Sequence, residues 1–364
     1  MIPATNLAVL PPLYSTWMEE MLPGSIQPER LATCHDCAMC APAGGAPASG
    51  GPYFEPDVKC CSYVPSIWSF LVGRILEDLS PEAAEGRASL ELRIDAGVAV
   101  TPLGLGQTPV YKLLYQRVDA SSFGRTRSLR CPHYLEASGG CGIWRHREST
   151  CATYFCKFER GNVGREFWES MHWLLLSAEK ALAQWCALEL EVGTEALALL
   201  FPPPGEAALP PTAEELDGKV VPAEYRRRWG RWAGREREYF RAASRLVAPL
   251  RWQQIEALAG PELLARKALV LAAYEQVTSE EIPDRLWASP VRLEFQGAVA
   301  GRVHVEAGGA ALNLPEELVN ELRRFDGRLT AEVLGEIRKE SGLELTAGLV
   351  RKLADHGILR GEAE

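Results

Sequence analysis

The cysteines of this chain are concentrated in two short stretches of its N-terminal half, and this pattern constrains the fold more than any other feature. Nine of the ten cysteines lie in these stretches: Cys34, Cys37, Cys40, Cys60 and Cys61 in the first, and Cys131, Cys141, Cys151 and Cys156 in the second. Thiolates at such short spacings can reach one metal centre with little loss of loop entropy. The sequence therefore predicts a metal site made from these nine cysteines.

Composition indicates a soluble globular protein of two or three domains, with 364 residues, 47% hydrophobic and 24% charged. The net charge of −9 argues against non-specific attraction to nucleic acid or to an anionic membrane. The apolar run at residues 7–13 is too short for a secretory signal or a membrane span. We therefore expect a cytoplasmic protein without a membrane partner. In that compartment clustered cysteines are more often metal ligands than disulfides; five disulfides in a secreted chain are the alternative.

Hydrophobic periodicity predicts an α+β fold that is mostly helical. We expect a cysteine-rich metal-binding domain over residues 1–162, a helical domain over 163–288 and a small winged-helix-like domain over 289–364. Helices are predicted over 15–22, 62–80 and 164–200, and again within 212–276, where Thr212 and Glu215 form a capping-box pattern. Alternating apolar residues predict strands within 88–118, 291–295 and 302–305. Three helices are predicted at the end, over 314–325, 330–339 and 346–356.

The first cysteine group begins with a C-x2-C-x2-C run at Cys34, Cys37 and Cys40. This run favours an iron–sulfur cluster over zinc, which usually takes paired C-x2-C knuckles. The neighbours Cys60 and Cys61 suit two separate centres, or one centre held through a turn. Because nine cysteines exceed one four-ligand site, we favour two centres. The predicted cofactor is therefore one or two [4Fe-4S] clusters, with zinc as the alternative.

Two arginines and three histidines lie among the cysteines. Arg145 and Arg147 are predicted to bind the cofactor, because a guanidinium can donate hydrogen bonds to cluster sulfides or offset thiolate charge; the alternative is two ordinary surface arginines. The histidines are weaker candidates for ligands, since thiolates are abundant: His35, His133 and His146. Cys186 lies alone in an apolar helical pattern and is predicted to be a buried structural cysteine.

The second cysteine group, Cys131 to Cys156, resembles the YkgJ-type cysteine-cluster family, a zinc- or iron-chelating family named for its CxxCxxCC motif. The positions that carry the resemblance are Cys131, Cys141, Ile143, Trp144, Arg147, Cys151 and Phe155. The likeness covers roughly residues 34–160. The chain departs from the family pattern in the pair Cys60 and Cys61, which follows the C-x2-C-x2-C run by about twenty residues instead of closing it. It also departs at Trp144, where the family usually has Tyr, at Glu148, where it often has Pro, and in the added Cys156. The family includes flagellin lysine N-methylases, so the resemblance implies metal binding and a protein-modifying role.

The last segment resembles the PqqD-like peptide-recognition fold, a relative of the winged helix. The resemblance lies in Leu314-Pro-x2-Leu318, the turn at Phe325-Asp-Gly and the Leu349 to Gly357 pattern. It implies a protein or peptide partner docked along a sheet edge. Specific DNA binding is not expected, because the third helix offers few basic residues.

Residues 226–237 are rich in arginine with interleaved tryptophans, a combination that can bind single-stranded nucleic acid or an acidic peptide. Glutamates are intermixed, and Trp229 and Tyr239 fit the buried stripe of an amphipathic helix, so we predict a solvated helix face. The favoured function is a cytoplasmic metal-cluster protein, iron–sulfur in type, that acts on or with a protein or peptide partner in a redox or protein-modifying role. A structural zinc-binding interaction module and a lysine N-methylase-like methyltransferase are the alternatives, and whether the chain is an enzyme is left open.

Overall fold

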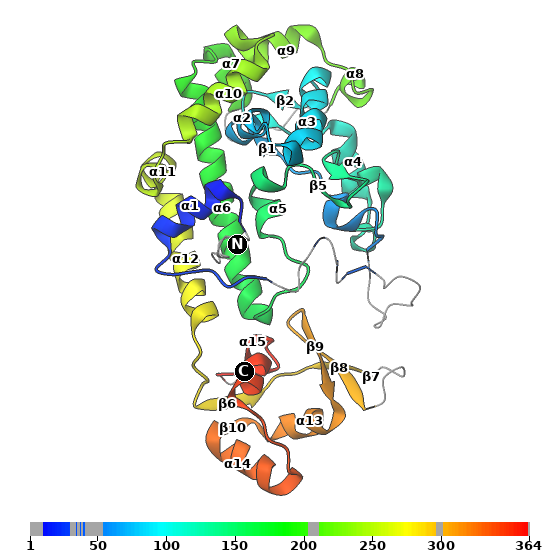
Figure 1. Cartoon of the computed structure of the whole chain (residues 1–364), viewed down its shortest axis with the longest axis vertical. Helices are drawn as coiled ribbons and strands as arrows, with labels where there is room; N and C mark the ends of the chain where they lie inside the picture. The colour runs from blue at the N-terminus through cyan, green and yellow to red at the C-terminus, as the bar shows by residue number, and fades with distance from the viewer. Residues whose placement is uncertain are drawn as a thin grey trace.

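The computed structural model describes residues 10–29, 34, 37, 39–40, 54–202, 211–295 and 301–362. Helices dominate, and the sheets are small and antiparallel, so the prediction of a mostly helical α+β fold is confirmed. A larger, mainly helical part contains the chain up to α12, and a smaller part follows it at the lower end of the molecule (Figure 1).

Helix α6 (Gly161–Glu189) is the central element of the larger part (Figure 1). Apolar residues recur along it at helical spacing, and Trp168, Met171 and Leu175 are almost completely buried. The predicted helix over 164–200 is interrupted after Glu189, where Glu191 and Gly193 adopt positive φ. A separate helix, α7 (Thr194–Leu200), follows.

The N-terminal part, which contains the clustered cysteines, is built mainly from short helices and strands. They are α1 (Pro12–Met21), η1 (Lys59–Ser62), β1 (Ile67–Trp68), α2 (Ser69–Glu77), α3 (Ala84–Ala96), β2 (Val100–Thr101), β3 (Gly104–Leu105), α4 (Pro109–Arg117), β4 (Tyr134–Leu135), β5 (Gly140–Cys141), η5 (Trp144–His146) and α5 (Ser149–Thr153). Of the strands predicted within 88–118, only the short β2 and β3 are present; the rest of the prediction is wrong, because residues 88–96 belong to α3 and residues 109–117 to α4. Leu90 and Ile94 are one helical turn apart and buried, whereas Leu92 is 71% exposed.

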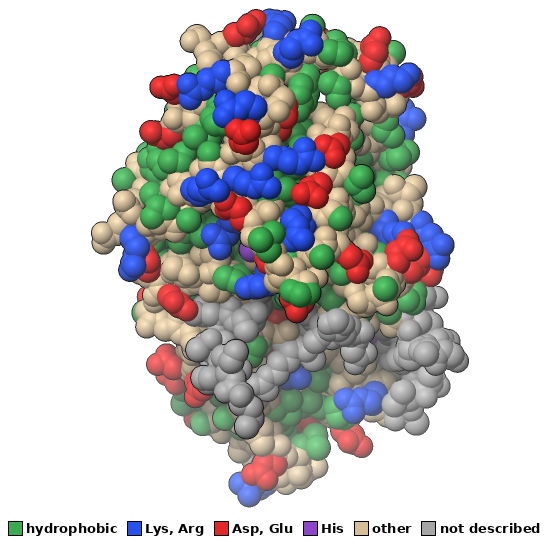
Figure 2. Space-filling model, turned by 45° about the horizontal axis from the view of Figure 1, so that its top comes forward, with side chains coloured by type: hydrophobic (Ala, Val, Ile, Leu, Met, Phe, Trp, Pro, Cys, Tyr) green, Lys and Arg blue, Asp and Glu red, His purple; other side chains and the backbone are tan. Residues whose placement is uncertain are grey.

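The helical middle contains α8 (Ala213–Leu216), α9 (Pro222–Trp229), α10 (Glu236–Val247), α11 (Trp252–Ala259) and α12 (Pro261–Thr278). The capping box of Thr212 and Glu215 is present at α8. Trp229 and Tyr239 are fully buried, and nearby arginines pair with carboxylates, such as Arg227 with Glu195. Lys and Arg side chains alternate with Asp and Glu over the upper surface (Figure 2). Four arginines of the segment 226–237 thus pair with the carboxylates of Glu195, Glu191, Glu238 and Asp95, above a buried aromatic stripe.

The C-terminal part contains β6 (Arg285–Ala288), β7 (Arg292–Phe295), β8 (Arg302–Ala307), β9 (Ala310–Pro315), α13 (Glu316–Glu321), β10 (Asp326–Leu329), α14 (Thr330–Ser341), α15 (Ala347–Asp355) and β11 (Leu359–Arg360). The sheets have the orders β7-β8-β9 and β10-β6-β11. The helix predicted from residue 314 begins instead at Glu316, because Leu314 belongs to β9 and lies opposite Val303. Strand β9 itself was not predicted.

Two large hydrophobic cores stabilise these parts, and a small third cluster contains Val64, Tyr111, Leu129 and Cys131. The larger core takes side chains from the cysteine region and from the helical middle alike, and the smaller one lies within residues 286–359. The C-terminal part docks on the start of α6, where the Arg160 guanidinium makes two hydrogen bonds to Asp355, at 2.5 and 3.0 Å. Asn162 Nδ2 donates to the carbonyl oxygens of Ala307 and His356. This junction begins only a few residues after Cys156.

Candidate metal centre

Six cysteines line a single cavity of about 510 Å³ in the N-terminal half. They come from both cysteine groups: Cys34, Cys60, Cys61, Cys131, Cys141 and Cys151. All ten cysteines of the chain are free thiols. The structure thus brings the two separated stretches together without forming a disulfide.

Local hydrogen bonds hold the cysteine segments around this cavity. The ammonium group of Lys59 donates to the carbonyl oxygens of Cys34, at 2.6 Å, and Gly139, at 2.9 Å, and so joins the two groups. The Cys131 amide donates to the Cys61 carbonyl at 2.6 Å. Helix α5 presents Cys151, whose amide donates to the Glu148 carboxylate at 2.8 Å as part of the helix N-cap.

The three remaining cysteines of the predicted set form a second group beside the cavity. The Cys37 thiol lies near enough to the thiols of Cys40 and Cys156 for these groups to shift one another's pKa. Cys60 and Cys61 are neighbours in η1, and Cys60 is near enough to Cys37 and Cys156 to interact with them electrostatically. The nine sulfurs are therefore divided six and three, with Cys60 near both groups.

Burial makes the ionised form of the cavity thiols unfavourable unless positive charge lies nearby. Burial raises the pKa of Cys131 to about 12 and of Cys141 to about 11. Burial also raises the pKa of Cys151 well above its usual value. In the second group, the hydrogen bond from Cys156 lowers the pKa of Cys37. Thiolates in the cavity therefore require a nearby cation.

Arg147 supplies one positive charge inside the cavity. Its side chain is nearly buried, lies 3.3 Å from the centre of the Trp144 ring, and donates to the Cys151 carbonyl at 3.2 Å. Arg145 does not line the cavity: its side chain is 58% exposed, and its nearest carboxylate is Asp78, at 3.9 Å. Of the two predicted arginines, only Arg147 is placed to contact a bound group.

The histidines of the cysteine groups have other partners. Both ring nitrogens of the fully buried His133 are hydrogen-bonded, Nδ1 to the Ser89 hydroxyl and Nε2 to Arg93, so neither is available to a metal. His146 Nε2 faces Asp78 at 2.8 Å. His35 lies outside the described residues. His172 of α6 does line the cavity, although nothing in the sequence pattern singled it out.

A buried carboxylate lies directly behind the cavity wall and was missed by the sequence reasoning. Glu179 of α6 is fully buried and accepts four hydrogen bonds: from the Ser149 amide at 2.8 Å, the Ser149 hydroxyl at 2.6 Å, Trp68 Nε1 at 3.1 Å and the Tyr14 hydroxyl. Burial and the neighbouring Glu148 raise the pKa of Glu179 to about 8. Glu179 thereby fixes α1, β1 and the start of α5 against α6.

The thiols of the cavity do not form a ready-made site for a single ion. Among the residues that the structure describes, no three His, Cys, Asp or Glu side chains are arranged to hold one metal ion. Four thiolates bound to one zinc at about 2.3 Å would lie within about 4 Å of one another. The cavity therefore offers six cysteines as donors without specifying which metal they would hold.

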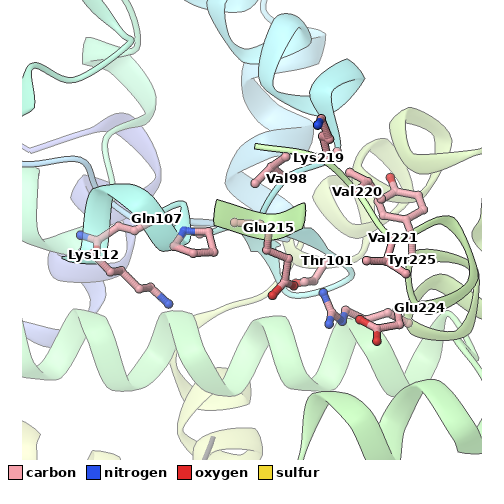
Figure 3. A pocket seen from close by; sticks show the side chains of 15 residues that line it. Val98, Thr101, Gln107, Lys112, Glu215, Lys219, Val220, Val221, Glu224 and Tyr225 are labelled. Atoms are coloured by element: carbon pink, nitrogen blue, oxygen red, sulfur yellow. The ribbon is translucent and has the colours of Figure 1, made fainter. Parts of the chain in front are cut away.

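A second cavity, of about 280 Å³, lies between the β2–β3 hairpin and helices α8 and α9 (Figure 3). It has no cysteine in its lining. Its charged side chains are mixed in sign, with Lys112, Lys219 and Arg228 against Glu215 and Glu224. This arrangement offers no soft metal donors, so the cysteine-lined cavity is the candidate centre.

No protein-family model matches the chain, and no curated protein or solved structure is significantly similar to it. Within the described part of the chain, we find no helix with both the length and the apolar character needed to cross a membrane. The function must therefore be inferred from the geometry of the site.

Proposed function

We propose that the protein binds one or two [4Fe-4S] clusters through its nine clustered cysteines and acts on or with a protein or peptide partner. The observation that carries this proposal is the cavity lined by six cysteines with the Arg147 guanidinium among them. The free thiols and the resemblance to the YkgJ-type family support it further.

The first centre would be held by cysteines of the cavity, and the second by Cys37, Cys40 and Cys156, with Cys60 able to serve either. When bound, such a cluster supplies one-electron transfer. Arg147 offsets thiolate charge, and Lys59 keeps the two cysteine segments together through its hydrogen bonds. Aromatic side chains also line the cavity, among them Tyr63, Phe123 and Tyr154.

The partner would bind the C-terminal part. The β7-β8-β9 sheet followed by α13, α14 and α15 is compatible with a PqqD-like winged helix. Strand β9 is at the edge of this sheet and pairs only with β8 among the described strands. An edge strand of this kind can accept an added peptide strand.

The test is purification without oxygen, followed by iron, sulfide and zinc analysis and a visible spectrum. We expect about four or eight iron atoms per chain, for one or two clusters. The Cys131→Ser/Cys141→Ser variant should lose iron, whereas Cys186→Ser, which removes the buried tenth cysteine, should retain it. A protein that binds neither iron nor zinc would refute the metal centre.

A structural zinc site is the second candidate, favoured by the thiols of Cys40 and Cys156, which both lie near enough to the Cys37 thiol to shift its pKa. In that case the protein would be colourless and would contain stoichiometric zinc. Chelation would then unfold the cysteine region without any redox signal.

A further inference from the structure

A third cavity, of about 300 Å³, lies where the C-terminal part meets the start of α6. We call it the junction cavity. One wall is formed by residues between 156 and 165, and the other by the first residues of β9 together with Lys352 of α15 and His356, which follows this helix. Because Cys156 belongs to this wall, the junction cavity adjoins the three-cysteine group.

The junction cavity carries an excess of positive charge on an otherwise acidic protein. Lys157, Arg165 and Lys352 line it, against one carboxylate, Glu159. Arg165 donates to Asn162 Oδ1 and to the Gly308 carbonyl, which are neutral acceptors, so its charge is not cancelled. Neither lysine has an ion-pair partner among the described residues. The chain as a whole has a net charge of −9.

The same cavity also exposes backbone that can pair with an extended chain. Ala310, Ala311 and Leu312 of β9 line it, and β9 has no second neighbour among the described strands. Because the side chains of Ala310 and Ala311 are small, they leave space beside β9 for an added chain. Backbone amides and carbonyls at a sheet edge bind any extended peptide, so the surrounding side chains must select which one.

We propose that the junction cavity binds an extended peptide segment rich in Asp and Glu, paired with β9, whose carboxylates contact Lys157, Arg165 and Lys352. This inference rests on the peptide partner of the proposed function and specifies its chemistry. A segment held there lies against Cys156, and so next to the three-cysteine group. Charge-assisted hydrogen bonds to carboxylates supply the selectivity that the strand edge lacks.

The experiment is selection of random dodecapeptides displayed on phage against the full-length protein, followed by synthesis of the best peptide and of its counterpart with every Asp and Glu replaced by Asn and Gln. We expect enrichment of Asp and Glu, and binding of the amide counterpart at least tenfold weaker. Lys157→Gln/Lys352→Gln should weaken binding of the acidic peptide several-fold and reduce its salt dependence. Both lysines are exposed, so this variant should fold normally.

The matched control is Arg338→Gln/Lys339→Gln, which removes two exposed charges of α14 outside the cavity and should leave binding unchanged. The inference is overturned if no peptide is selected, if the selected peptides lack an acidic excess, or if the amide counterpart binds equally well. It is also overturned if the control variant weakens binding as much as the lysine variant. Iron analysis of the same preparations reports on the cysteines alone, so failure of the metal centre remains distinguishable from failure of the peptide site.

Discussion

Gly73 allows helices α2 and α10 to pack in direct backbone contact, and replacing it with Ala tests this packing. A Cβ atom at position 73 would lie 2.0 Å from the Phe240 carbonyl oxygen and 2.6 Å from Ser244 Cβ. Carbon contacts are optimal at about 3.5 Å, so the helices would have to separate by about 1.5 Å. Neither obstacle can move by a change of rotamer, because one is backbone and the other is a Cβ atom.

The expected cost follows from two opposing effects. Overpacking of a core typically costs about 1–3 kcal/mol, and the rigidity of this contact places Gly73→Ala at the upper end. The higher helix propensity of Ala relative to Gly offsets about 0.5–1 kcal/mol of this cost. We therefore expect a net loss of about 2 kcal/mol in the free energy of unfolding. The displaced α2 also begins next to Trp68 and ends next to Asp78, whose side chains contact Glu179 and His146.

Scanning calorimetry and urea unfolding followed by tryptophan fluorescence measure this loss. The control is Gly335→Ala in α14, where an added Cβ meets no atom within 4 Å, and which should be neutral or stabilising by up to about 1 kcal/mol. A Gly73→Ala variant as stable as the wild type would refute the close packing of α2 on α10.

Three further predictions concern the site. Burial raises the pKa of Glu179 to about 8 in the folded protein, against an ordinary value of 4.5. The wild type should therefore lose stability as the pH rises from about 4.5 to 8, by up to about 1.4 kcal/mol per pH unit, whereas Glu179→Gln should lack this fall. Parallel pH profiles of the two proteins would contradict the assignment. Arg147→Gln should reduce the iron retained after purification without oxygen, while Arg145→Gln, which alters an exposed arginine, should not; equal retention by the two variants would exclude a role for Arg147. His133→Ala should lower the unfolding temperature, because it leaves Ser89 and Arg93 without their partner, but should keep the metal content of the wild type; loss of metal would identify His133 as a ligand after all.

Sequence patterns predicted those elements whose periodicity is set by local burial. The helical spacing around Phe70 and Ile75 corresponds to α2, and Thr212 caps α8 as expected. The alternation of Leu90, Leu92 and Ile94 was misleading, because the outer two positions also lie on one helix face. Strand β9 was missed because small residues, Ala310 and Ala311, give it little β character.

The sequence predicted those parts of the candidate site that residue type alone identifies. Cysteines at short spacings are recognisable in the sequence, and six of the nine line one cavity in the structure. Arg145 and Arg147 are two positions apart in the same motif, and only the turn of η5 separates an exposed guanidinium from a buried one. Nothing in the sequence identified Glu179 as part of the site, because its hydrogen-bond partners Tyr14, Trp68 and Ser149 come from distant parts of the chain.

The ion pair of Arg160 and Asp355 has a mechanical consequence. Three residues separate Cys156 from Arg160, and Arg160 also donates to the Val277 carbonyl at the end of α12. Arg160 therefore ties the segment that follows Cys156 to the ends of both α12 and α15. Loss of the Arg160 guanidinium would weaken the docking of the C-terminal part only four positions from a proposed ligand.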